Sequence, residues 1–219
     1  MTKPLRLGIA GLGTVGVGVI KIIQNKLSLL EARTGKQILI SAVTAKSKTK
    51  ERGIDLSSYQ WERDPVSLAN RKDIDVFIEL IGGHEGAAKE AVEIAISKGK
   101  NVVTANKALL AHHGHKLALK AEKNGSILRF EAAVAGGIPV IKSLTEGLAG
   151  NSINRIMGVM NGTCNYILTR MESSGLSYEQ VFSEANELGY LEADPNLDIG
   201  GIDAAHKLSI LSSIAFGTE

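Results

Sequence analysis

Short apolar runs alternate with segments of helical periodicity through the first 130 residues of the chain. The runs end at glycine or small polar residues, which is typical of buried parallel strands. Strands are predicted over residues 5–10, 37–44, 74–81, 101–104 and 127–130. Helices are predicted over residues 15–30, 85–98 and about 113–123. This alternation predicts an α/β fold built on a doubly wound parallel sheet of the Rossmann type.

The pattern changes after Glu131, where the sequence Gly-Gly-Ile-Pro interrupts the chain. Helices are predicted over residues 140–148, 164–173, 178–188 and 203–215, and a strand over residues 153–160. Two parts are therefore expected: a dinucleotide-binding domain over 1–130 and an α+β substrate or catalytic region over 131–219. Residues 45–72 are basic and polar, and Pro65 within them predicts irregular structure.

Composition narrows the class of protein. The chain has 219 residues, 44% hydrophobic and 22% charged, as is usual for a folded globular protein. Its 25 basic and 23 acidic side chains nearly cancel, so charge does not indicate a nucleic-acid partner. No apolar run is long enough to predict a membrane span. The single cysteine, Cys164, excludes an internal disulfide and favours a reducing compartment, so a cytoplasmic location is expected.

The most specific short motif is Gly11-Leu12-Gly13-Thr14-Val15-Gly16, which follows a predicted strand and opens a predicted helix. The first glycine permits the turn, the second allows close approach of a pyrophosphate, and the third lets helix and strand pack closely. The first helical N–H groups, near Thr14 and Val15, then present partial positive charge to phosphates. In this context the motif predicts a dinucleotide site, although a purely structural glycine turn is the alternative.

The sequence after the second predicted strand bears on which dinucleotide binds. Sites that prefer NAD usually have an acidic residue there, which bonds the ribose 2′-hydroxyl. Here the segment carries Lys46, Lys48, Lys50 and Arg52, and no acidic residue precedes Glu51. These cations favour NADP, because they can neutralise a 2′-phosphate, and Lys46 is assigned to the cofactor. NAD and a solvated basic loop are the alternatives.

Two further strand ends carry candidate ligand-binding residues. The segment 79–83 reads ELIGG, and the next strand ends in Thr104-Ala105-Asn106-Lys107. Ligands in open α/β sheets sit beyond the carboxyl ends of strands, so both segments are expected at one crevice. Thr104 is assigned to cofactor binding. Lys107 is a candidate for ligand binding or proton donation, with a surface lysine as the alternative.

The segment 188–207 gathers acidic residues around a Pro/Gly turn, including Glu192, Asp198 and Asp203. Lys207 follows Asp203 by four residues, which places both side chains on one face of a predicted helix. A lysine held beside carboxylates is suited to moving a proton. The alternative is a surface salt bridge, worth only about 0.3–0.5 kcal/mol.

Other chemistries fit the sequence less well. The acidic segment is not a calcium loop, because Ile199 and Ala205 stand where that loop needs glycine and glutamate. Cys164 would be a nucleophile only if its thiol were activated, and a small core residue is the commoner role. No convincing set of metal ligands accompanies the histidines at positions 112, 113 and 115.

With these residues assembled, the chain resembles the homoserine dehydrogenases over nearly its whole length. The resemblance rests on six separated motifs: GLGTVG at 11–16, ELIGG at 79–83, TANKALLA at 104–111, FEAAVAGGIPVI at 130–141, NGTCNYIL at 161–168 and LGYLEADPNLDIGGIDAAHK at 188–207. It implies interconversion of homoserine and aspartate 4-semialdehyde with NAD(P)H, a step toward threonine, isoleucine and methionine. Carried over by motif, Lys207 and Asp203 fall on the family's catalytic pair, and Lys107 on a second lysine.

The resemblance also implies ligands for the rest of the site. Glu192 falls on the residue that holds the substrate ammonium group. The substrate pocket is completed by Gly162, Thr163, Tyr190 and Asp198. A monovalent cation, usually sodium, falls on Glu131 and on backbone carbonyls near Val134, Gly136 and Ile138.

Family members continue well beyond Glu219, so the resemblance implies a chain that is incomplete at its C-terminus and a homodimer or higher homo-oligomer in the full protein. Two other functions fit part of the sequence. An acylating aldehyde dehydrogenase of the aspartate-semialdehyde type would use Cys164 as its nucleophile. A non-catalytic module would bind NADP(H) and catalyse nothing.

Overall fold

The computed structural model describes residues 3–191 and 195–219. It divides into two compact units, with the boundary between Val140 and Ile141. The predicted boundary after residue 130 lies slightly earlier in the chain. The two units are described separately below.

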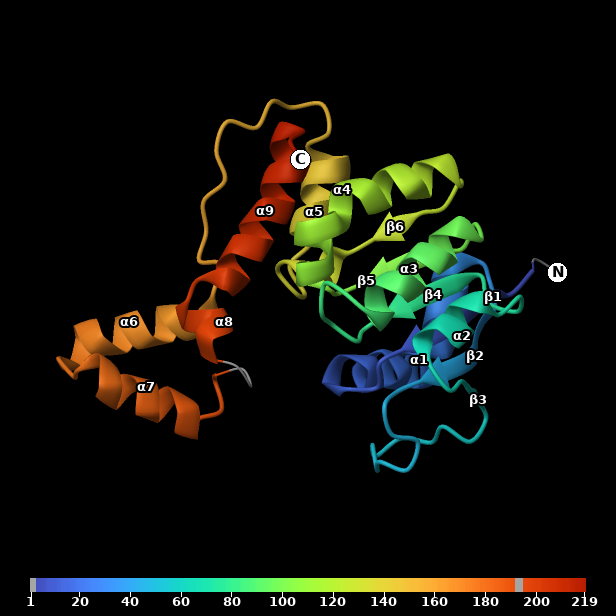
Figure 1. The fold of residues 1–219 in the computed structure, drawn as a ribbon, viewed down its shortest axis with the longest axis horizontal. Coiled ribbons are helices and arrows are strands. Elements are labelled where there is room, and N and C mark those ends of the chain that lie inside the picture. Colours follow the sequence, from blue (N-terminus) through green and yellow to red (C-terminus); the bar gives the residue numbers. More distant parts are fainter. Residues whose placement is uncertain (1–2, 192–194) are drawn as a thin grey trace. The chain divides into compact units, whose positions relative to one another are not determined.

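The first unit contains a six-stranded parallel sheet (Figure 1). Its strands are β1 (Leu5–Ala10), β2 (Ile38–Thr44), β3 (Gln60–Trp61), β4 (Val76–Glu79), β5 (Asn101–Thr104) and β6 (Leu128–Arg129). Their order across the sheet is β3-β2-β1-β4-β5-β6, and every pairing is parallel. The winding direction reverses between β1 and β4, which is where ligands bind in such sheets. The predicted Rossmann-type α/β fold is confirmed.

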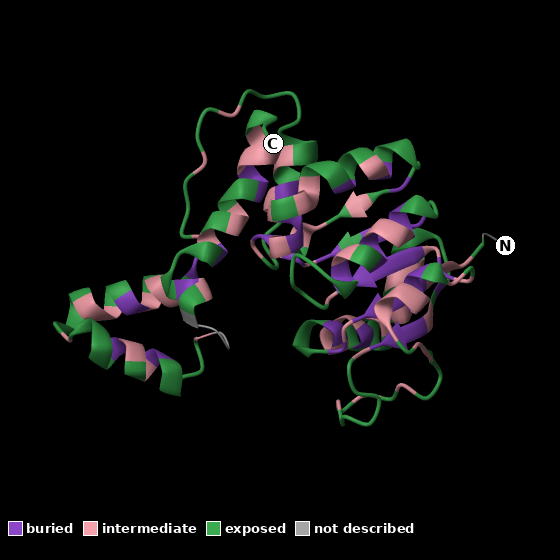
Figure 2. Cartoon of the chain, viewed as in Figure 1, coloured by how far each residue is buried: buried purple, intermediate pink, exposed green. Residues whose placement is uncertain are grey.

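Helices cover both faces of this sheet. They are α1 (Thr14–Thr34), α2 (Pro65–Asn70), α3 (Ala87–Ser97) and α4 (Lys107–Lys123), followed by the short 3-10 helix η1 (Glu131–Ala133). On one face Ile9 of β1 packs in a cluster with Ile20 of α1. On the other, Ala10 and Phe77 pack in a cluster with Leu109 of α4. Figure 2 shows the buried strands between the exposed outer sides of the helices. Burial on both faces explains the continuous apolar runs of the sequence.

The helix α2 was not expected, because Pro65 was interpreted as a sign of irregular structure. Pro65 is instead the first residue of the helix. A backbone N–H at this position would have no partner within the helix, so proline, which lacks it, is tolerated there. The side chain of Asp64 caps the helix and accepts a hydrogen bond from the backbone N–H of Ser67 at 2.6 Å. A cap and a proline thus encode a short helix inside a polar segment.

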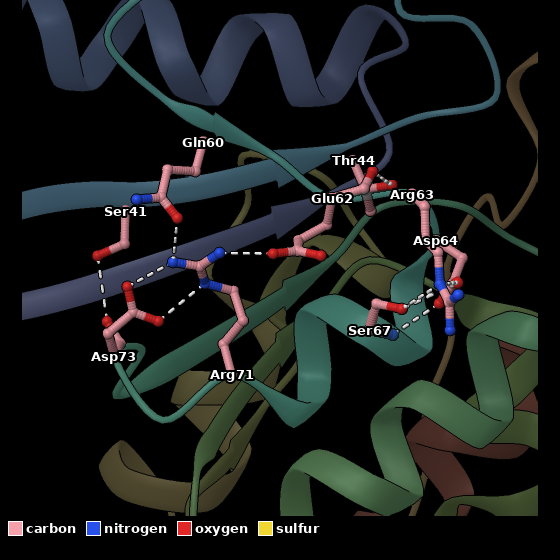
Figure 3. Close-up of polar contacts among 9 residues, drawn as sticks. All are labelled: Ser41, Thr44, Gln60, Glu62, Arg63, Asp64, Ser67, Arg71 and Asp73. Carbon is pink, nitrogen blue, oxygen red and sulfur yellow. Dashed lines mark hydrogen bonds and ion pairs between the residues drawn. The ribbon is translucent and has the colours of Figure 1, made fainter.

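A polar cluster after α2 reinforces the edge of the sheet (Figure 3). The guanidinium of Arg71 pairs with Glu62 at 2.5 Å and with Asp73 at 2.5 Å, and it also donates to the side chain of Gln60. The hydrogen bond from Arg71 lowers the pKa of Asp73. The hydroxyl of Ser41 donates to the backbone carbonyl of Asp73 at 3.2 Å. These contacts join β2, the short strand β3 and the approach to β4.

A second ion pair lies at the start of β4. The carboxylate of Asp75 accepts hydrogen bonds from the guanidinium of Arg6 at 3.0 and 3.1 Å, from the backbone N–H of Arg6 at 3.0 Å, and from Lys3 at 3.1 Å. The hydrogen bond from Arg6 is the largest of the effects that lower the pKa of Asp75. Because the folded state lowers the pKa of this carboxyl, the interaction stabilises the fold fully at pH values above the pKa of the unfolded state, about 3.9. The stabilisation is lost as the pH falls through the pKa of the folded state.

Asp75→Asn is therefore expected to lower the free energy of unfolding at neutral pH by about 1 kcal/mol, the scale of a partly exposed charged hydrogen-bond network. The difference from wild type should shrink as the pH falls below about 4. Thermal unfolding across a pH series measures it, with Glu122→Gln on the exposed side of α4 as the control. A deficit that is the same at every pH would contradict the assignment.

The second unit is helical in the part that the structure describes. It contains the π-helix η2 (Ser143–Gly147) and the helices α6 (Gly162–Ser174), α7 (Tyr178–Glu187), α8 (Pro195–Ile199) and α9 (Ile202–Phe216), while α5 (Val140–Lys142) spans the boundary. The helices α6 and α7 pack through Ile167, Val181 and Ala185. Ser177 and Gln180 form a capping box at the start of α7. No helix among the described residues is long and apolar enough to cross a membrane.

The strand predicted over residues 153–160 is wrong. These residues have no regular secondary structure, and Met157 and Val159 are 78% and 74% exposed. Alternating apolar residues favour a strand, but a strand forms only where a neighbour accepts and donates the ladder of hydrogen bonds. Among the described residues no strand pairs with this segment. The α+β character expected of the second part is therefore not seen there.

Candidate active site

The end of β1 and the start of α1 form a glycine-lined corner. Gly11 has a φ of 97°, a left-handed conformation that side chains rarely adopt. A Cβ on Gly11 would lie 2.3 Å from the carbonyl oxygen of Leu80, and one on Gly16 would lie 2.0 Å from the carbonyl oxygen of Gly11. Both contacts are with backbone, which cannot move aside. The two glycines therefore allow β1, β4 and α1 to approach closely, as the motif predicts.

Gly13, the middle glycine, differs from the other two. Its φ of −78° is open to any residue, and an added Cβ would meet no protein atom within 4 Å. Neither conformation nor packing therefore requires a glycine here. Its backbone instead lines a cavity of about 460 Å³ at the start of α1, next to the first helical residues Thr14 and Val15. A bare backbone beside exposed N–H groups is what a phosphate group needs for close approach.

Basic residues from the loop after β2 line the same cavity. Lys46, Lys50 and Arg52 contribute to its wall, and Arg63 contributes from the segment before α2. Lys48, which the sequence also proposed, does not line it. The cationic wall lies beyond the carboxyl end of β2, where the sequence analysis expected the adenosine ribose.

Arg52 has a structural part in this wall. Its guanidinium donates to the backbone carbonyls of Leu12 at 3.2 Å, Lys50 at 2.7 Å and Ser47 at 2.5 Å. Its guanidinium carbon also lies 5.6 Å from the ring centre of Trp61. Because these contacts use most of its donors, Arg52 fastens the basic loop to the glycine corner.

The cavity wall also includes an acidic residue, Asp64, which no sequence motif had indicated. Its carboxylate accepts from the backbone N–H and hydroxyl of Ser67 at 2.6 and 2.9 Å, and from Arg63 at 2.9 Å. The backbone hydrogen bond from Ser67 is the largest of the effects that lower its pKa. Its main visible task is to cap α2, so it does not stand in for the missing acidic residue of β2.

A buried carboxylate organises the other strand ends. Glu79, the last residue of β4, is fully buried. One of its oxygens accepts from the backbone N–H groups of Ile81 and Gly82 at 2.7 and 3.1 Å. The other accepts from the hydroxyl of Thr104, at the end of β5, at 2.5 Å. Thr104 is itself buried, so its side chain joins two strand ends and does not face the cavity.

The network continues into the first turn of α4. The hydroxyl of Thr104 accepts from the backbone N–H of Asn106 at 2.9 Å, and the side chain of Asn106 donates to the carbonyl of Gly83 at 2.7 Å. Asn106 also caps α4 by accepting from the backbone N–H of Leu109 at 3.0 Å. Lys107, the first residue of α4, is thereby attached to a rigid support. The helix begins six positions before the predicted start near His113 because of this cap.

In the second unit, Asp203 and Lys207 form a close ion pair on the first turns of α9. The ammonium nitrogen of Lys207 lies 2.7 Å from Oδ2 of Asp203 and donates to the carbonyl of Met160 at 2.9 Å. The side chain of Asp203 is 3% exposed and that of Lys207 is 20% exposed. The predicted helical spacing is confirmed, and the burial excludes an ordinary surface salt bridge.

Asn161, the first residue of the NGTCNYIL motif, links this pair to a second carboxylate. Its amide nitrogen donates to Oδ1 of Asp198 at 2.8 Å and to Oδ2 of Asp203 at 3.0 Å. Its amide oxygen accepts from the backbone N–H of Cys164 at 2.7 Å and caps α6. All three polar side chains at this junction are at least nine-tenths buried. The sequence signal for the cap was present, but nothing in it indicated the carboxylate partners.

Cys164 is poorly placed to act as a nucleophile. Burial raises the pKa of its thiol, and the nearby carboxylates of Asp198 and Asp203 raise it further. Its sulfur donates to the backbone carbonyl of Asp198 at 3.3 Å. A catalytic thiolate needs the opposite environment, in which positive charge lowers the thiol pKa.

Two family models together match nearly the whole chain. The model described as the NAD-binding domain of homoserine dehydrogenase matches residues 11–131, and the homoserine dehydrogenase model matches residues 139–219. The chain belongs to the homoserine dehydrogenase family. The first match ends at residue 131 and the second begins at residue 139, close to the boundary between the two structural units at Val140 and Ile141.

Individual homoserine dehydrogenases are similar across the full chain. The enzyme of Neisseria gonorrhoeae is 50% identical over 216 residues, which are 99% of this chain and 49% of the relative. The crystal structure of the Thiobacillus denitrificans enzyme matches with a TM-score of 0.93 and 44% identity, over 99% of this chain and 50% of that one. A hyperthermophilic archaeal homoserine dehydrogenase in complex with NADPH matches with a TM-score of 0.87 and 29% identity. The match covers 99% of this chain and 71% of that one.

The chain spans about half the length of the curated homoserine dehydrogenases it matches. The NAD-binding fold of the family is present in the first unit, and the expected pair of Asp203 and Lys207 is present in the second.

The remaining homoserine dehydrogenase positions lie around the Asn161 junction. Gly162 and Thr163 open α6, and the hydroxyl of Thr163 donates to the carbonyl of Tyr190 at 2.9 Å. The ring of Tyr190 is half exposed and meets the ring of Tyr166 edge-on, with centres 4.9 Å apart. Glu192 lies outside the described residues, as does Asp194.

The positions expected to bind a cation lie at and after η1. Glu131 opens this turn, Gly136 has a φ of 59°, and Ile138 is 67% exposed. The backbone N–H of Ile138 donates to the carbonyl of Ala135 at 3.1 Å. No cluster of three or more histidine, cysteine or acidic side chains suited to a metal occurs among the described residues. One carboxylate with several carbonyls is nevertheless a donor set suited to a hard cation such as sodium.

Proposed function

We propose that the complete protein, meaning the full product of its gene, is a homoserine dehydrogenase that interconverts L-homoserine and L-aspartate 4-semialdehyde with a nicotinamide cofactor. The observation that carries the proposal is the partly buried Lys207 ammonium, which is held between the carboxylate of Asp203 and the carbonyl of Met160. An ammonium has three N–H donors. Those two contacts use two of them, which leaves one for the oxygen of a substrate.

The proton is handled by this chain's own residues. NAD(P)H, when bound, supplies the hydride to the carbonyl carbon. Lys207 stabilises the charge that develops on the carbonyl oxygen and donates the proton that completes the alcohol. In the reverse direction it accepts the hydroxyl proton. Asp203 keeps the ammonium oriented, and Lys107 is proposed as a second cation for the substrate or for proton transfer.

The remaining substrate contacts follow the family pattern. Glu192 is proposed to bind the substrate ammonium group, and the pocket is proposed to include Gly162, Thr163, Tyr190 and Asp198. For the pocket residues, support comes from their placement around the start of α6, where Thr163 bonds to Tyr190 and Asp198 bonds to Asn161.

For the cofactor, we propose that Gly11, Gly13, Thr14, Val15 and Gly16 cradle the pyrophosphate at the start of α1. Thr104 is proposed to act indirectly, because its hydroxyl is committed to Glu79. NADP is preferred over NAD, with Lys46 meeting the 2′-phosphate, because basic residues form the wall beyond β2. The NADPH bound by the archaeal relative is compatible with this preference.

Lys46→Ala is expected to weaken binding of NADPH at least about tenfold, which is 1.4 kcal/mol, and to change NADH binding little. A single charge–phosphate contact at a partly exposed site accounts for this size. Fluorescence titration with each cofactor measures the change in the complete protein. Lys48→Ala is the matched control, since Lys48 is exposed in the same loop but does not line the cavity. Equal losses for NADPH and NADH would contradict a 2′-phosphate contact.

Further properties belong to the same proposal. A sodium ion bound by Glu131 and the carbonyls of Val134, Gly136 and Ile138 would fix the segment that follows β6. The reaction is placed in threonine, methionine and isoleucine synthesis, in the cytoplasm, in a homodimer or larger homo-oligomer. An acylating dehydrogenase is disfavoured, because the environment of Cys164 raises its thiol pKa.

Transfer of deuterium tests the reaction class. The complete protein is mixed with aspartate 4-semialdehyde and NADPH carrying deuterium at nicotinamide C4, and the product is examined by mass spectrometry. Homoserine with deuterium at C4 is expected. An acyl phosphate formed from the semialdehyde in the presence of phosphate and NADP would identify the acylating reaction. Cofactor binding without any turnover would identify a binding module.

A further inference from the structure

We infer that Asn161 is a positioning residue for the proposed proton transfer, because it bridges two buried carboxylates, Asp198 and Asp203, and the second of them pairs with Lys207. The inference deepens the proposed function and rests on it. The amide nitrogen of Asn161 has two N–H groups, and the structure gives each a carboxylate partner: Asp198 at 2.8 Å and Asp203 at 3.0 Å.

The orientation of the amide is determined by its other partner. Its oxygen accepts from the backbone N–H of Cys164 at 2.7 Å. If the amide were turned over, its oxygen would face two carboxylate oxygens and its nitrogen would face an N–H group. Both contacts would be repulsive, so only the observed orientation is possible.

The hydrogen bonds from Asn161 offset part of the cost of burying two carboxylates close together. The side chains of Asp198 and Asp203 are 2% and 3% exposed, so neither carboxylate can rely on water. Lys207 neutralises Asp203 directly, at 2.7 Å. The two N–H groups of Asn161 donate to both carboxylates, which helps to stabilise the buried charges and limits the distance between the two acids.

Among the described residues, the charged and titratable groups at this bridge come from three elements. Asp198 lies on α8, Asp203 and Lys207 lie on α9, and the Cys164 thiol lies on α6. Asn161 precedes α6 and contacts all three elements. The same oxygen of Asp203 accepts from both Asn161 and Lys207. A shift of Asn161 therefore moves the carboxylate that orients the ammonium.

This role is separable from helix capping. Asparagine, aspartate and serine are comparable N-cap residues, because each offers an oxygen to the first turn. Asn161→Asp keeps the cap but replaces the two donors with a third carboxylate. Asn161→Ser keeps the cap but is too short to reach both acids. A capping role alone predicts that both variants behave like wild type.

The test measures kcat and KM for homoserine oxidation by the complete protein across a pH series. For Asn161→Asp we expect kcat at neutral pH to fall about 100-fold, the loss that a displacement of about 1 Å near the reacting atoms can cause. The loss should shrink as pH is lowered, because a protonated carboxyl can again donate to its neighbour. Asn161→Ser should lose activity to a similar degree at every pH. The KM for NADP should stay within about twofold for both.

Asn165→Asp is the matched control, because it makes the same charge change at an exposed position of α6. It should leave kcat and its pH profile unchanged. Wild-type kcat with a wild-type pH profile in Asn161→Asp would overturn the inference. So would a loss in Asn161→Asp that does not depend on pH.

A second readout keeps this test distinct from that of the proposed function. If wild-type protein oxidised no homoserine, the proposed function would fail, and the inference that depends on it would fail with it. The bridge itself would still be measured by Tm. Asn161→Asp should lower Tm at neutral pH and recover at acidic pH, whereas Asn165→Asp should do neither. If wild type is active and Asn161→Asp shows no pH-dependent loss of Tm, the inference about the Asn161 bridge is contradicted and the proposed function is not.

Discussion

Lys207→Met in the complete protein is expected to lower kcat for homoserine oxidation by about 100- to 10,000-fold, the contribution of a well-placed proton donor or acceptor. Methionine is similar in length but has no charge and no ionisable proton to transfer. The affinity for NADPH should change less than about twofold, because the cofactor contacts proposed above lie in the first unit. Steady-state kinetics and cofactor titration measure the two quantities. Lys116→Met, an exposed lysine of α4, is the control and should be neutral.

Two further variants separate chemistry from folding. Removing Lys207 leaves Asp203 buried beside it without its cation, a change that by itself destabilises a protein by about 3–5 kcal/mol. The double variant Asp203→Asn/Lys207→Met removes both charges and should regain Tm without regaining turnover. Lys207→Arg keeps the charge but transfers a proton poorly, because a guanidinium does not readily deprotonate. Turnover restored in the double variant would show that Lys207 matters only for stability.

Gly13→Ala is expected to weaken NADPH binding at least about tenfold while leaving the fold intact. The added methyl meets no protein atom within 4 Å and needs no change in φ, so the loss would come from the ligand side of the surface. Dinucleotide titration and thermal unfolding of the same sample measure both effects. Undiminished affinity would mean that the pyrophosphate does not lie on Gly13.

Gly18→Ala is the matched control within α1. Its Cβ also meets nothing within 4 Å, but it lies inside the helix and does not line the cavity. It should raise the free energy of unfolding by about 0.5–1 kcal/mol, because alanine is the better helix former, and leave cofactor affinity unchanged. The pair therefore compares a glycine-to-alanine change that lines the cavity with one that does not, and neither added methyl meets a protein atom within 4 Å.

The sheet was predictable because its burial leaves a local record. Strands β1 and β4 are mostly buried, so each reads as a short, mainly apolar run that is followed by glycine within a few residues. The steric needs of Gly11 and Gly16 are likewise local. The helical spacing of Asp203 and Lys207 required only that one helix begin near Asp203.

The two elements that the sequence predicted incorrectly depend on a neighbouring strand or on a weak local signal. The segment 153–160 has strand-like composition, but composition does not reveal whether a neighbouring strand is present. Helix α2 is encoded by a cap and a proline inside a polar stretch, a signal easily outweighed by its surroundings. Local patterns thus predict the sheet, whereas strand pairing and short capped helices depend on contacts that form only in the folded protein.

The polar networks of the site could not be predicted, because their members are far apart in the sequence. Asn161 is 37 and 42 residues from its two carboxylate partners, and Glu79 is 25 residues from Thr104. An asparagine before a helix predicts a cap and nothing about what its amide nitrogen meets. The fold brings these groups together, and only the coordinates reveal it.

The central claim is that Lys207, oriented by Asp203, transfers the proton when the substrate carbonyl is reduced. A single-turnover experiment tests it most directly, because it isolates the chemical step from product release. Complete wild-type protein and Lys207→Met are each saturated with NADPH, mixed rapidly with aspartate 4-semialdehyde, and followed by the loss of NADPH absorbance. We predict equal initial absorbance from bound cofactor and a decay at least about 100-fold slower in the variant. Decay at the wild-type rate in Lys207→Met would contradict the claim.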